Sequence, residues 1–246
     1  ASSGGSGSDI STAPAPVGIN QPLNPEHIVP CNKISQQIKN TDFDAKMQIL
    51  RDNYSAQSEK GFSQNTDGSF TALPLNADGH TLGNPYSSTV IGYLHSHQNS
   101  SEDGSVNEDG YPIVKSPIKM FSPKDILSFL DIVRNADNND IPIADVYATL
   151  TTNNGTYTIR FTGDVEDVQN KITLLRAKFN QDGYNKFIYV PYFTKKHQYN
   201  KERAFLHWLK DEVGIEGVNL YKIKPSGQVQ PKSLKENGRV KTENCN

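Results

Sequence analysis

The sequence predicts an α+β fold of α/β/α-like layering, in which a central curved mixed sheet is flanked by helices. Short runs rich in β-branched and aromatic residues, such as SSTVIGYLHSH at 87–97, are typical of strands. Segments with a helical period of apolar residues lie between such runs. A chain of 246 residues with 35% hydrophobic content is long enough to bury one sizeable core with a small addition.

The first elements are helical and are followed by a hairpin. Apolar residues recur at helical spacing over 34–54, so we expect one helix there that is broken near residue 40, with Thr41 and Asp42 able to cap the second part. Asp67 and Gly68 separate two short alternating runs, a pattern that predicts a hairpin. The strand that ends in His-Ser-His comes next.

The middle of the chain combines an irregular segment with a well-marked helix. Residues 98–119 are polar and contain glycine and proline, so they are expected to form an excursion without regular structure. A helix over about 122–135 follows. Ser122 is its predicted cap, proline takes the first helical position, and Asp125 stands three residues after the cap.

Two hairpins, two helices and one short strand are expected in the last hundred residues. Asn-Gly at 154–155 predicts a hairpin, and 165–179 has one apolar face of a helix. The run KFIYVPYF at 186–193 is expected to be a short strand or extended piece. A helix over 200–214 is predicted to end at its glycine, and 218–234 resembles a last hairpin.

These elements divide the chain into three predicted regions. Residues 1–30 are a flexible leader rich in glycine, serine and proline, with too little apolar surface to offset the entropy of ordering. Residues 31–163 form the core, and 164–246 form a helical and hairpin extension that packs on it.

The charge balance and hydropathy exclude two classes of partner. The formal net charge is −2, with 25 basic and 27 acidic residues, so the chain lacks the positive field that holds a phosphate backbone. Nucleic acid is therefore not an expected partner. An uninterrupted apolar run of about 18 residues is lacking as well, and no transmembrane segment is expected.

Two cysteines, Cys31 and Cys245, stand near opposite ends of the predicted folded part. A disulfide between them would close a loop of about 200 residues and stabilise the fold by about 4 to 5 kcal/mol in the chain-entropy model. Such a bond predicts an extracytoplasmic protein. The alternative is a pair of unrelated thiols in a reducing cytosol.

The motif His95-Ser-His97 could hold a metal ion. Residues two apart on a strand project from the same face, so both imidazoles can point at one position where the strand end opens into a cleft. Asp125 is the candidate third ligand, because the first turn of the following helix can face back toward the strand end. The alternative for Asp125 is a helix-capping role that needs no metal.

In combination, these residues resemble the JAMM/MPN family of zinc metallopeptidases. That family has a distant Glu, then His-X-His-Pro, then Ser-X-X-Asp, and the matching residues are Glu59, His95, His97, Ser122 and Asp125. The likeness covers roughly residues 41–163. It implies a cytidine-deaminase-like MPN core and one Zn²⁺ bound by the two histidines and the aspartate.

The same resemblance implies the roles of the remaining two residues. Glu59 would act as general acid-base on a zinc-activated water, and Ser122 would donate a hydrogen bond to the oxyanion. Two features depart from the family pattern. Gln98 replaces the usual proline, and the 28 positions from His97 to Asp125 exceed the family spacing, so about twenty residues are inserted as a lid or as disordered filler.

The predicted function is therefore zinc-dependent hydrolysis of a peptide or isopeptide bond in a polypeptide substrate. A linker-like leader and a disulfide are typical of a secreted, periplasmic or surface-tethered bacterial protein. Two alternatives remain open: a non-catalytic MPN-type scaffold or binding protein, and a convergent metal-dependent hydrolase of another ester or amide. The substrate and the oligomeric state are not predicted.

Overall fold

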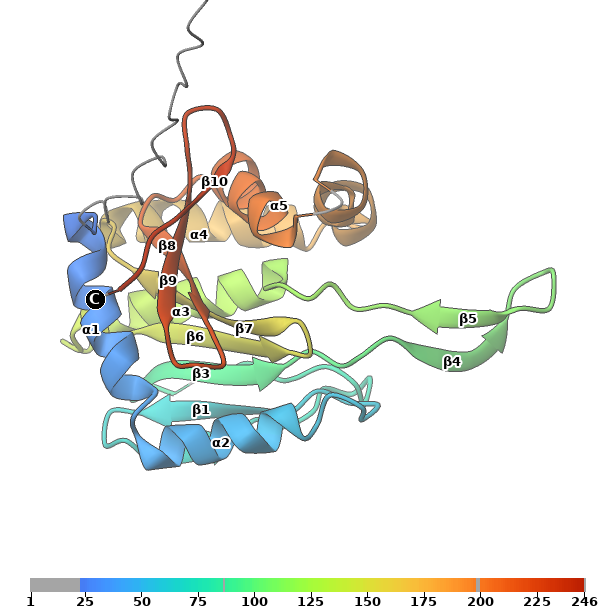
Figure 1. Ribbon diagram of the computed structural model, residues 1–246, viewed down its shortest axis with the longest axis horizontal. Helices are drawn as coiled ribbons and strands as arrows, with labels where there is room; N and C mark the ends of the chain where they lie inside the picture. The colour runs from blue at the N-terminus through green and yellow to red at the C-terminus, as the bar shows by residue number, and fades with distance from the viewer. Residues whose placement is uncertain (1–22, 86, 198–199, 246) are drawn as a thin grey trace, which may run out of the picture.

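The computed structural model describes residues 23–85, 87–197 and 200–245. The strands of its large sheet are β1 Gly61–Asn65, β2 Phe70–Ala72, β3 Val90–Ser96, β6 Tyr147–Thr152, β7 Gly155–Phe161, β8 Val218–Ile223, β9 Val229–Leu234 and β10 Val240–Thr242. They lie in the order β10-β9-β8-β7-β6-β3-β1-β2 (Figure 1). Strands β3 and β6 pair in parallel, and the other neighbours pair antiparallel. The predicted α+β class with a mixed central sheet is confirmed.

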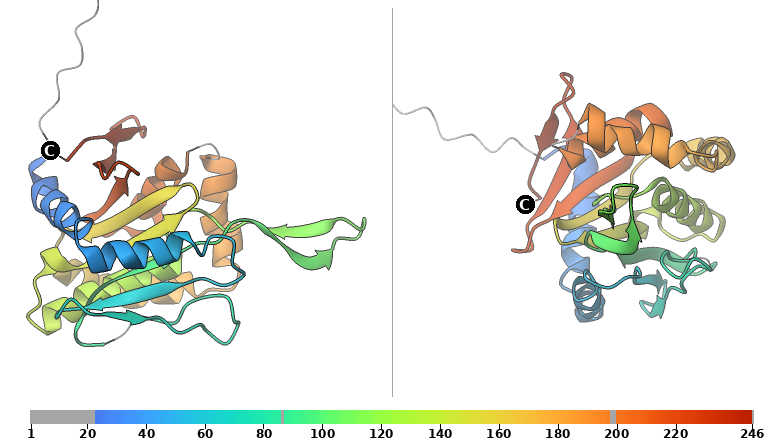
Figure 2. Two further views of the ribbon diagram at one scale, coloured as in Figure 1. Left: turned by 60° about the horizontal axis from the view of Figure 1, so that its bottom comes forward. Right: turned by 90° about the vertical axis from the view of Figure 1, so that its right-hand side faces the viewer.

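Helices cover both faces of this sheet, as the prediction required. The α-helices are α1 Ile28–Gln37, α2 Thr41–Arg51, α3 Pro123–Asn138, α4 Val165–Phe179 and α5 Lys201–Trp208. Helices α1 and α2 lie on one face, and α3, α4 and α5 lie on the other (Figures 1 and 2). Strand side chains alternate between the two layers, so that Tyr93 packs with α3 while Leu94 packs with α2.

The N-terminal helices differ from the prediction in two details. The break near residue 40 is present, but Asn40 is the cap: its Oδ1 accepts hydrogen bonds from the backbone N–H groups of Asp42 and Phe43 at 2.9 Å. Thr41 is already the first helical residue. Residues 1–22 of the predicted leader lie outside the described residues. Residues 25–30 are helical, since Pro25–His27 form a 3-10 turn and α1 begins at Ile28.

The predicted excursion contains regular structure. Strands β4 Ser101–Val106 and β5 Pro112–Lys115 pair antiparallel and project from the body as a ribbon, here called the arm (Figures 1 and 2). At its turn, the Asn107 side chain accepts hydrogen bonds from the backbone N–H groups of Asp109 and Tyr111. A ribbon that stands clear of the core has no need of an apolar face, so its sequence lacks the alternation by which strands are recognised.

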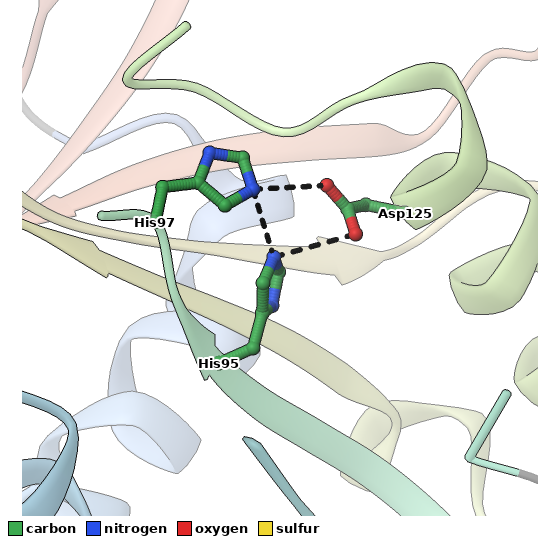
Figure 3. Close-up of side chains that lie close together, drawn as sticks. All are labelled: His95, His97 and Asp125. Atoms are coloured by element: carbon green, nitrogen blue, oxygen red, sulfur yellow. Dashed lines mark hydrogen bonds and ion pairs between the residues drawn. The ribbon is translucent and has the colours of Figure 1, made fainter. Parts of the chain in front are cut away.

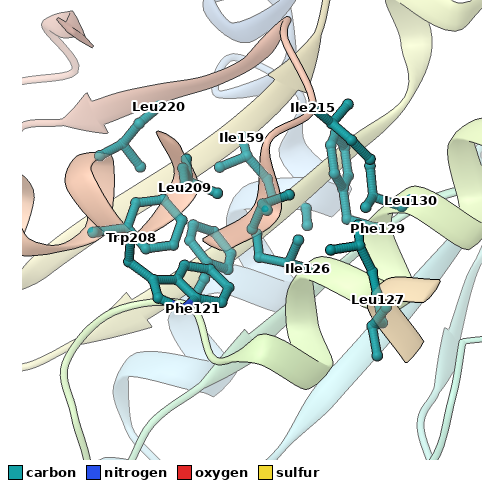
Figure 4. Packing of buried hydrophobic residues seen from close by; sticks show 14 of the residues in the cluster. Phe121, Ile126, Leu127, Phe129, Leu130, Ile159, Trp208, Leu209, Ile215 and Leu220 are labelled. Atoms are coloured by element: carbon teal, nitrogen blue, oxygen red, sulfur yellow. The ribbon is translucent and has the colours of Figure 1, made fainter. Parts of the chain in front are cut away.

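The run KFIYVPYF is helical, and the expectation of a strand was wrong. It forms two π-helical turns, Asn185–Tyr189 and Tyr192–Lys196. The helical turns bury Tyr189 against Trp208, with ring centroids 5.1 Å apart, and the Tyr189 hydroxyl donates to the carbonyl of Phe121 at 2.5 Å. Burial in this aromatic core therefore outweighed the strand propensity of the residues. Figure 4 shows Trp208 and Phe121 within the same packed layer.

The other predicted elements of the C-terminal half are confirmed. Helix α4 spans the predicted 165–179 and buries Val168, Ile172, Leu175 and Phe179. The helix over 200–214 ends at Gly214, whose φ of 62° lies in the left-handed region. Strands β8 and β9 form the predicted hairpin, and β10 was missed. Because β8 pairs with β7, the predicted extension continues the same sheet as the core.

The disulfide between Cys31 and Cys245 is present, with Cα atoms 5.5 Å apart, so the predicted pairing is confirmed. It ties α1 to the residues after β10, and the same contact region includes buried Ile34, Tyr221 and Val229. None of the described helices combines the length and the apolar content that a membrane span requires.

Candidate metal centre

Strand β3 carries His95, and His97 follows directly after its last residue. Tyr93, His95 and His97 project from the face that α3 covers, and the Tyr93 and His95 rings stack with centroids 5.4 Å apart. On its two edges β3 pairs with β1 and β6, which hold the backbone rigidly up to Ser96. Both imidazoles are buried, with 2% and 7% exposure for His95 and His97. The sequence expectation that both point at one position agrees with this geometry.

Asp125 faces the two histidines from the first turn of α3 (Figure 3). The Nε2 atoms of His95 and His97 are 3.3 Å apart, and Asp125 oxygens lie 3.3 Å from His95 Nε2 and 3.7 Å from His97 Nε2. A direct charge-assisted hydrogen bond would be shorter, about 2.7 to 2.9 Å. Ligand atoms around a tetrahedral zinc, each about 2.0 to 2.2 Å from the metal, lie about 3.3 to 3.6 Å apart. The three donors therefore surround a position that a metal ion could occupy.

The outer contacts of these side chains suit metal binding. His97 Nδ1 is 2.8 Å from the carbonyl oxygen of Ile118, so Nδ1 carries the hydrogen and Nε2 presents a lone pair to the centre. His95 Nδ1 has no hydrogen-bond partner of normal geometry among the described residues, although the Thr149 carbonyl is near enough to raise the pKa of the ring. The donor set of two imidazoles and one carboxylate fits zinc and other divalent transition ions.

Asp125 combines the two roles that the sequence left as alternatives. Its Oδ2 accepts a hydrogen bond from the backbone N–H of Ser122 at 2.7 Å, while its backbone N–H donates to Ser122 Oγ at 3.2 Å, which completes a capping box. The same carboxylate faces both histidines. The cap thus fixes the carboxylate in the orientation that the centre needs.

Glu59 stands beside the centre, just before β1. Its Oε1 lies 3.7 Å from His97 Nε2, and its backbone N–H bonds to the His80 carbonyl at 2.9 Å. Burial raises the pKa of the Glu59 carboxyl to about 7, because the nearby carboxylate of Asp125 adds to the desolvation while His95 opposes it only in part. Ser122 also borders the centre, and its hydroxyl oxygen serves as the cap acceptor. A hydroxyl that accepts a bond can still donate its own hydrogen.

In the metal-free protein the pKa values of the two imidazoles shift in opposite directions. Burial alone would lower the pKa of His95, but Asp125 raises it above the ordinary value. Burial and the neighbouring His95 lower the pKa of His97 to about 4. Although burial alone would raise the pKa of Asp125, its contacts with His95 hold it well below the ordinary value. These shifts favour an ionised Asp125 and a neutral His97 at neutral pH.

The centre lies in an open cleft with a volume of about 410 Å³. Much of its wall is apolar and comes from Leu73, Leu82, Ile118, Met120, Tyr189 and Val190. A larger hollow of about 940 Å³ lies between α2 and the turns after β6 and β8. Among the described residues, neither this hollow nor any other region contains a second group of three side chains that could ligate a metal ion.

Several residues of the site were not expected from the sequence. Tyr93 could have been found, because it stands two positions before His95 on the same face of the strand. Leu82, Ile118, Lys124 and Tyr189 carry no motif, and tertiary folding alone brings them to the cleft.

The chain matches no family model, no curated protein and no solved structure.

Proposed function

We propose that this protein is a zinc-dependent peptidase or isopeptidase that hydrolyses an amide bond in a polypeptide substrate. The observation that carries the proposal is the convergence of His95, His97 and Asp125 beside the carboxyl of Glu59, in an open cleft. Three protein ligands with space for water and substrate are typical of catalytic zinc sites, whereas structural sites are closed by four.

The residues present fit a zinc ion. His95 and His97 would offer Nε2 and Asp125 an oxygen, and the contact of His97 Nδ1 with Ile118 selects the tautomer that binding requires. When bound, zinc supplies Lewis acidity, which lowers the pKa of a coordinated water to about 7 and polarises the scissile carbonyl.

Glu59 is suited to move the proton. Its carboxyl lies 3.7 Å from His97 Nε2, where it can accept a proton from the attacking water and return it to the leaving amine. Ser122, the N-cap of α3, can donate its hydroxyl hydrogen to the developing oxyanion while its oxygen still accepts the capping hydrogen bond from the Asp125 backbone N–H. Apolar walls around these groups keep the local dielectric low and strengthen both interactions.

The order of elements supports an MPN-type core. Helix α2 is followed by Glu59 and β1, then by β3 with His95 near its end and His97 just after it, then by α3 with its cap Ser122 and Asp125 in its first turn. The arm occupies the insertion between the last two. The disulfide supports a secreted, periplasmic or surface-tethered bacterial protein.

Metal analysis tests the proposal first. Purified protein is expected to hold about one zinc per chain, and His95→Ala and His97→Ala should each lose it. His80→Ala is the matched control, because His80 is exposed and its ring bonds only the Gln57 carbonyl among the described residues. Equal zinc content in all four proteins would place the metal elsewhere.

Glu59→Gln separates metal binding from turnover. The variant should retain zinc and lose at least about 100-fold in cleavage of an unbiased peptide library, a typical loss for a general base. Glu108→Gln, an exposed acid in the turn of the arm, serves as the control for charge. If wild type with one zinc cleaves nothing in the library or in unfolded protein, the scaffold alternative replaces the peptidase.

A further inference from the structure

Lys124 is the only lysine or arginine among the described residues that line the cleft. It follows Pro123 in the first turn of α3, one position before Asp125, so the same turn presents a carboxylate to the metal centre and an ammonium to the adjoining wall. The side chain is exposed. Ser128, one helical turn further on, also lines this wall.

The loop residue Leu82 lies next to both Lys124 and Glu59. The Lys124 Nζ donates to the Leu82 carbonyl oxygen at 2.7 Å, and the Leu82 backbone N–H is near enough to the Glu59 carboxyl to lower its pKa. The hydrogen bond holds the ammonium against the cleft wall, whereas a lysine without such a bond would extend into solvent. It is also near enough to act electrostatically on Glu59.

Among the described residues, the positive charge of Lys124 has no counter-ion in direct contact. No carboxylate of the described residues lies within ion-pair distance of its Nζ, and the contact with Leu82 uses one of three N–H donors. The neighbouring walls are apolar, with Met120 fully buried and Leu82 8% exposed. An ammonium over such walls is attracted to an anionic ligand more strongly than one in open water.

We propose that the cleft selects polypeptide substrates that carry a carboxylate close to the scissile amide, and that Lys124 binds this carboxylate. The inference rests on the proposed function, whose substrate class it narrows. The carboxylate has two possible sources, an Asp or Glu side chain near the cleaved bond and the free α-carboxylate of a chain end. Both present the same acceptor oxygens to an ammonium.

Matched peptides provide the test. The probes are N-acetylated alanine heptapeptides with Asp or Asn at one position in turn, and a further pair that ends in a free carboxylate or an amide. With zinc-loaded wild type, kcat/KM is expected to be about tenfold higher for the acid than for the amide partner at the responsive position, the ratio that 1.4 kcal/mol of differential binding gives. The position that responds identifies the source of the carboxylate.

Three variants assign that preference to Lys124. In Lys124→Met the ratio should fall to about one with zinc content unchanged, and Lys124→Glu should favour peptides with Lys over those with Asp. Lys60→Met removes the same charge from an exposed lysine next to Glu59 in sequence but outside the cleft lining, and it should keep the wild-type ratio. A preference that survives Lys124→Met overturns the inference, since the metal would then select the carboxylate.

Binding to zinc-loaded Glu59→Gln keeps the two proposals distinguishable. Acid peptides should bind about tenfold more tightly than their amides, with the difference lost in the Glu59→Gln, Lys124→Met double variant. If wild type cleaves acid and amide peptides equally, the selectivity is wrong and the peptidase stands. If wild type cleaves nothing, the peptidase fails, and equal or absent binding of the paired peptides overturns the selectivity as well.

Discussion

Substitution of Asp125 offers the sharpest test of the centre, because this one carboxylate caps α3 and also faces both histidines. Asp125→Asn keeps an acceptor oxygen for the Ser122 backbone N–H but removes the charge. Asp125→Ala removes both. A comparison of the two variants, with and without zinc, therefore separates the helix cap from the metal ligand.

The structure sets the expected magnitudes. Loss of a helix cap costs about 0.5 to 2 kcal/mol, so in metal-free protein Asp125→Ala should be about 1 kcal/mol less stable than Asp125→Asn. A ligand that binds only the folded state adds about 2.7 kcal/mol at 100 times its dissociation constant. For a chain of this size that gain raises the Tm of wild type by about 5 to 10 °C. Neither variant retains the charged oxygen ligand, so neither should gain more than a small part of it.

The assay is thermal unfolding at pH 8 of the three proteins, first treated with EDTA and then supplemented with zinc at a fixed free concentration. Wild type alone should show the full rise in Tm, while the two variants should differ from each other by the cap contribution in both conditions. An equal rise in wild type and Asp125→Asn would refute the assignment of Asp125 as a ligand. His80→Ala controls for zinc bound at the surface.

Three further results are expected. Replacement of Cys31 and Cys245 by serine frees a loop with a sequence separation of 214 and should lower stability by about 5 kcal/mol in the chain-entropy model, measured by urea unfolding; a loss below about 1 kcal/mol would contradict that model here. In metal-free protein, burial raises the pKa of Glu59 to about 7, so the protonated carboxyl stabilises the fold below pH 4.5 and this stabilisation is lost as pH rises through 7. The free energy of unfolding of Glu59→Gln relative to wild type should therefore increase by about 3 kcal/mol between pH 4.5 and 8, and a constant difference would count against the raised pKa. Gly92→Ala would place a Cβ 2.7 Å from the carbonyl oxygen of Tyr147 in the neighbouring strand and should cost about 1 to 3 kcal/mol in thermal unfolding, whereas an unchanged Tm would mean that the β3–β6 pair separates without strain.

Local signals in the sequence predicted most of the elements. The turn at Gly155 needs only neighbouring residues, as does the capping box of Ser122 and Asp125, so both are recognisable without tertiary information. The heptad-like burial of α4 is also visible in its own periodicity. Prediction failed where a segment depends on distant partners. KFIYVPYF has strand propensity, but it is helical in the structure, and its Tyr189 packs against Trp208.

The residues of the candidate site also differ in how far the sequence alone could predict their positions. The two histidines are neighbours on one strand, and their common direction follows from the period of a strand. Asp125, 28 positions after His97, was a candidate ligand because it stands in the first turn of the following helix, but a helix-capping role remained the alternative. Glu59, 36 positions before His95, was expected only through resemblance to a family pattern. The contact of Lys124 with the Leu82 carbonyl spans 42 residues between two unremarked positions, and nothing in either local sequence indicates it.

The bond between Cys31 and Cys245 makes the chain between them a covalently closed ring. A proteolytic cut anywhere inside that ring, including one in the projecting arm, opens it without releasing a fragment. Such a nicked molecule would migrate as one species on a non-reducing gel and as two after reduction. Outside the reducing cytosol, damage to the arm would leave both halves of the sheet, and both sides of the cleft, attached to each other.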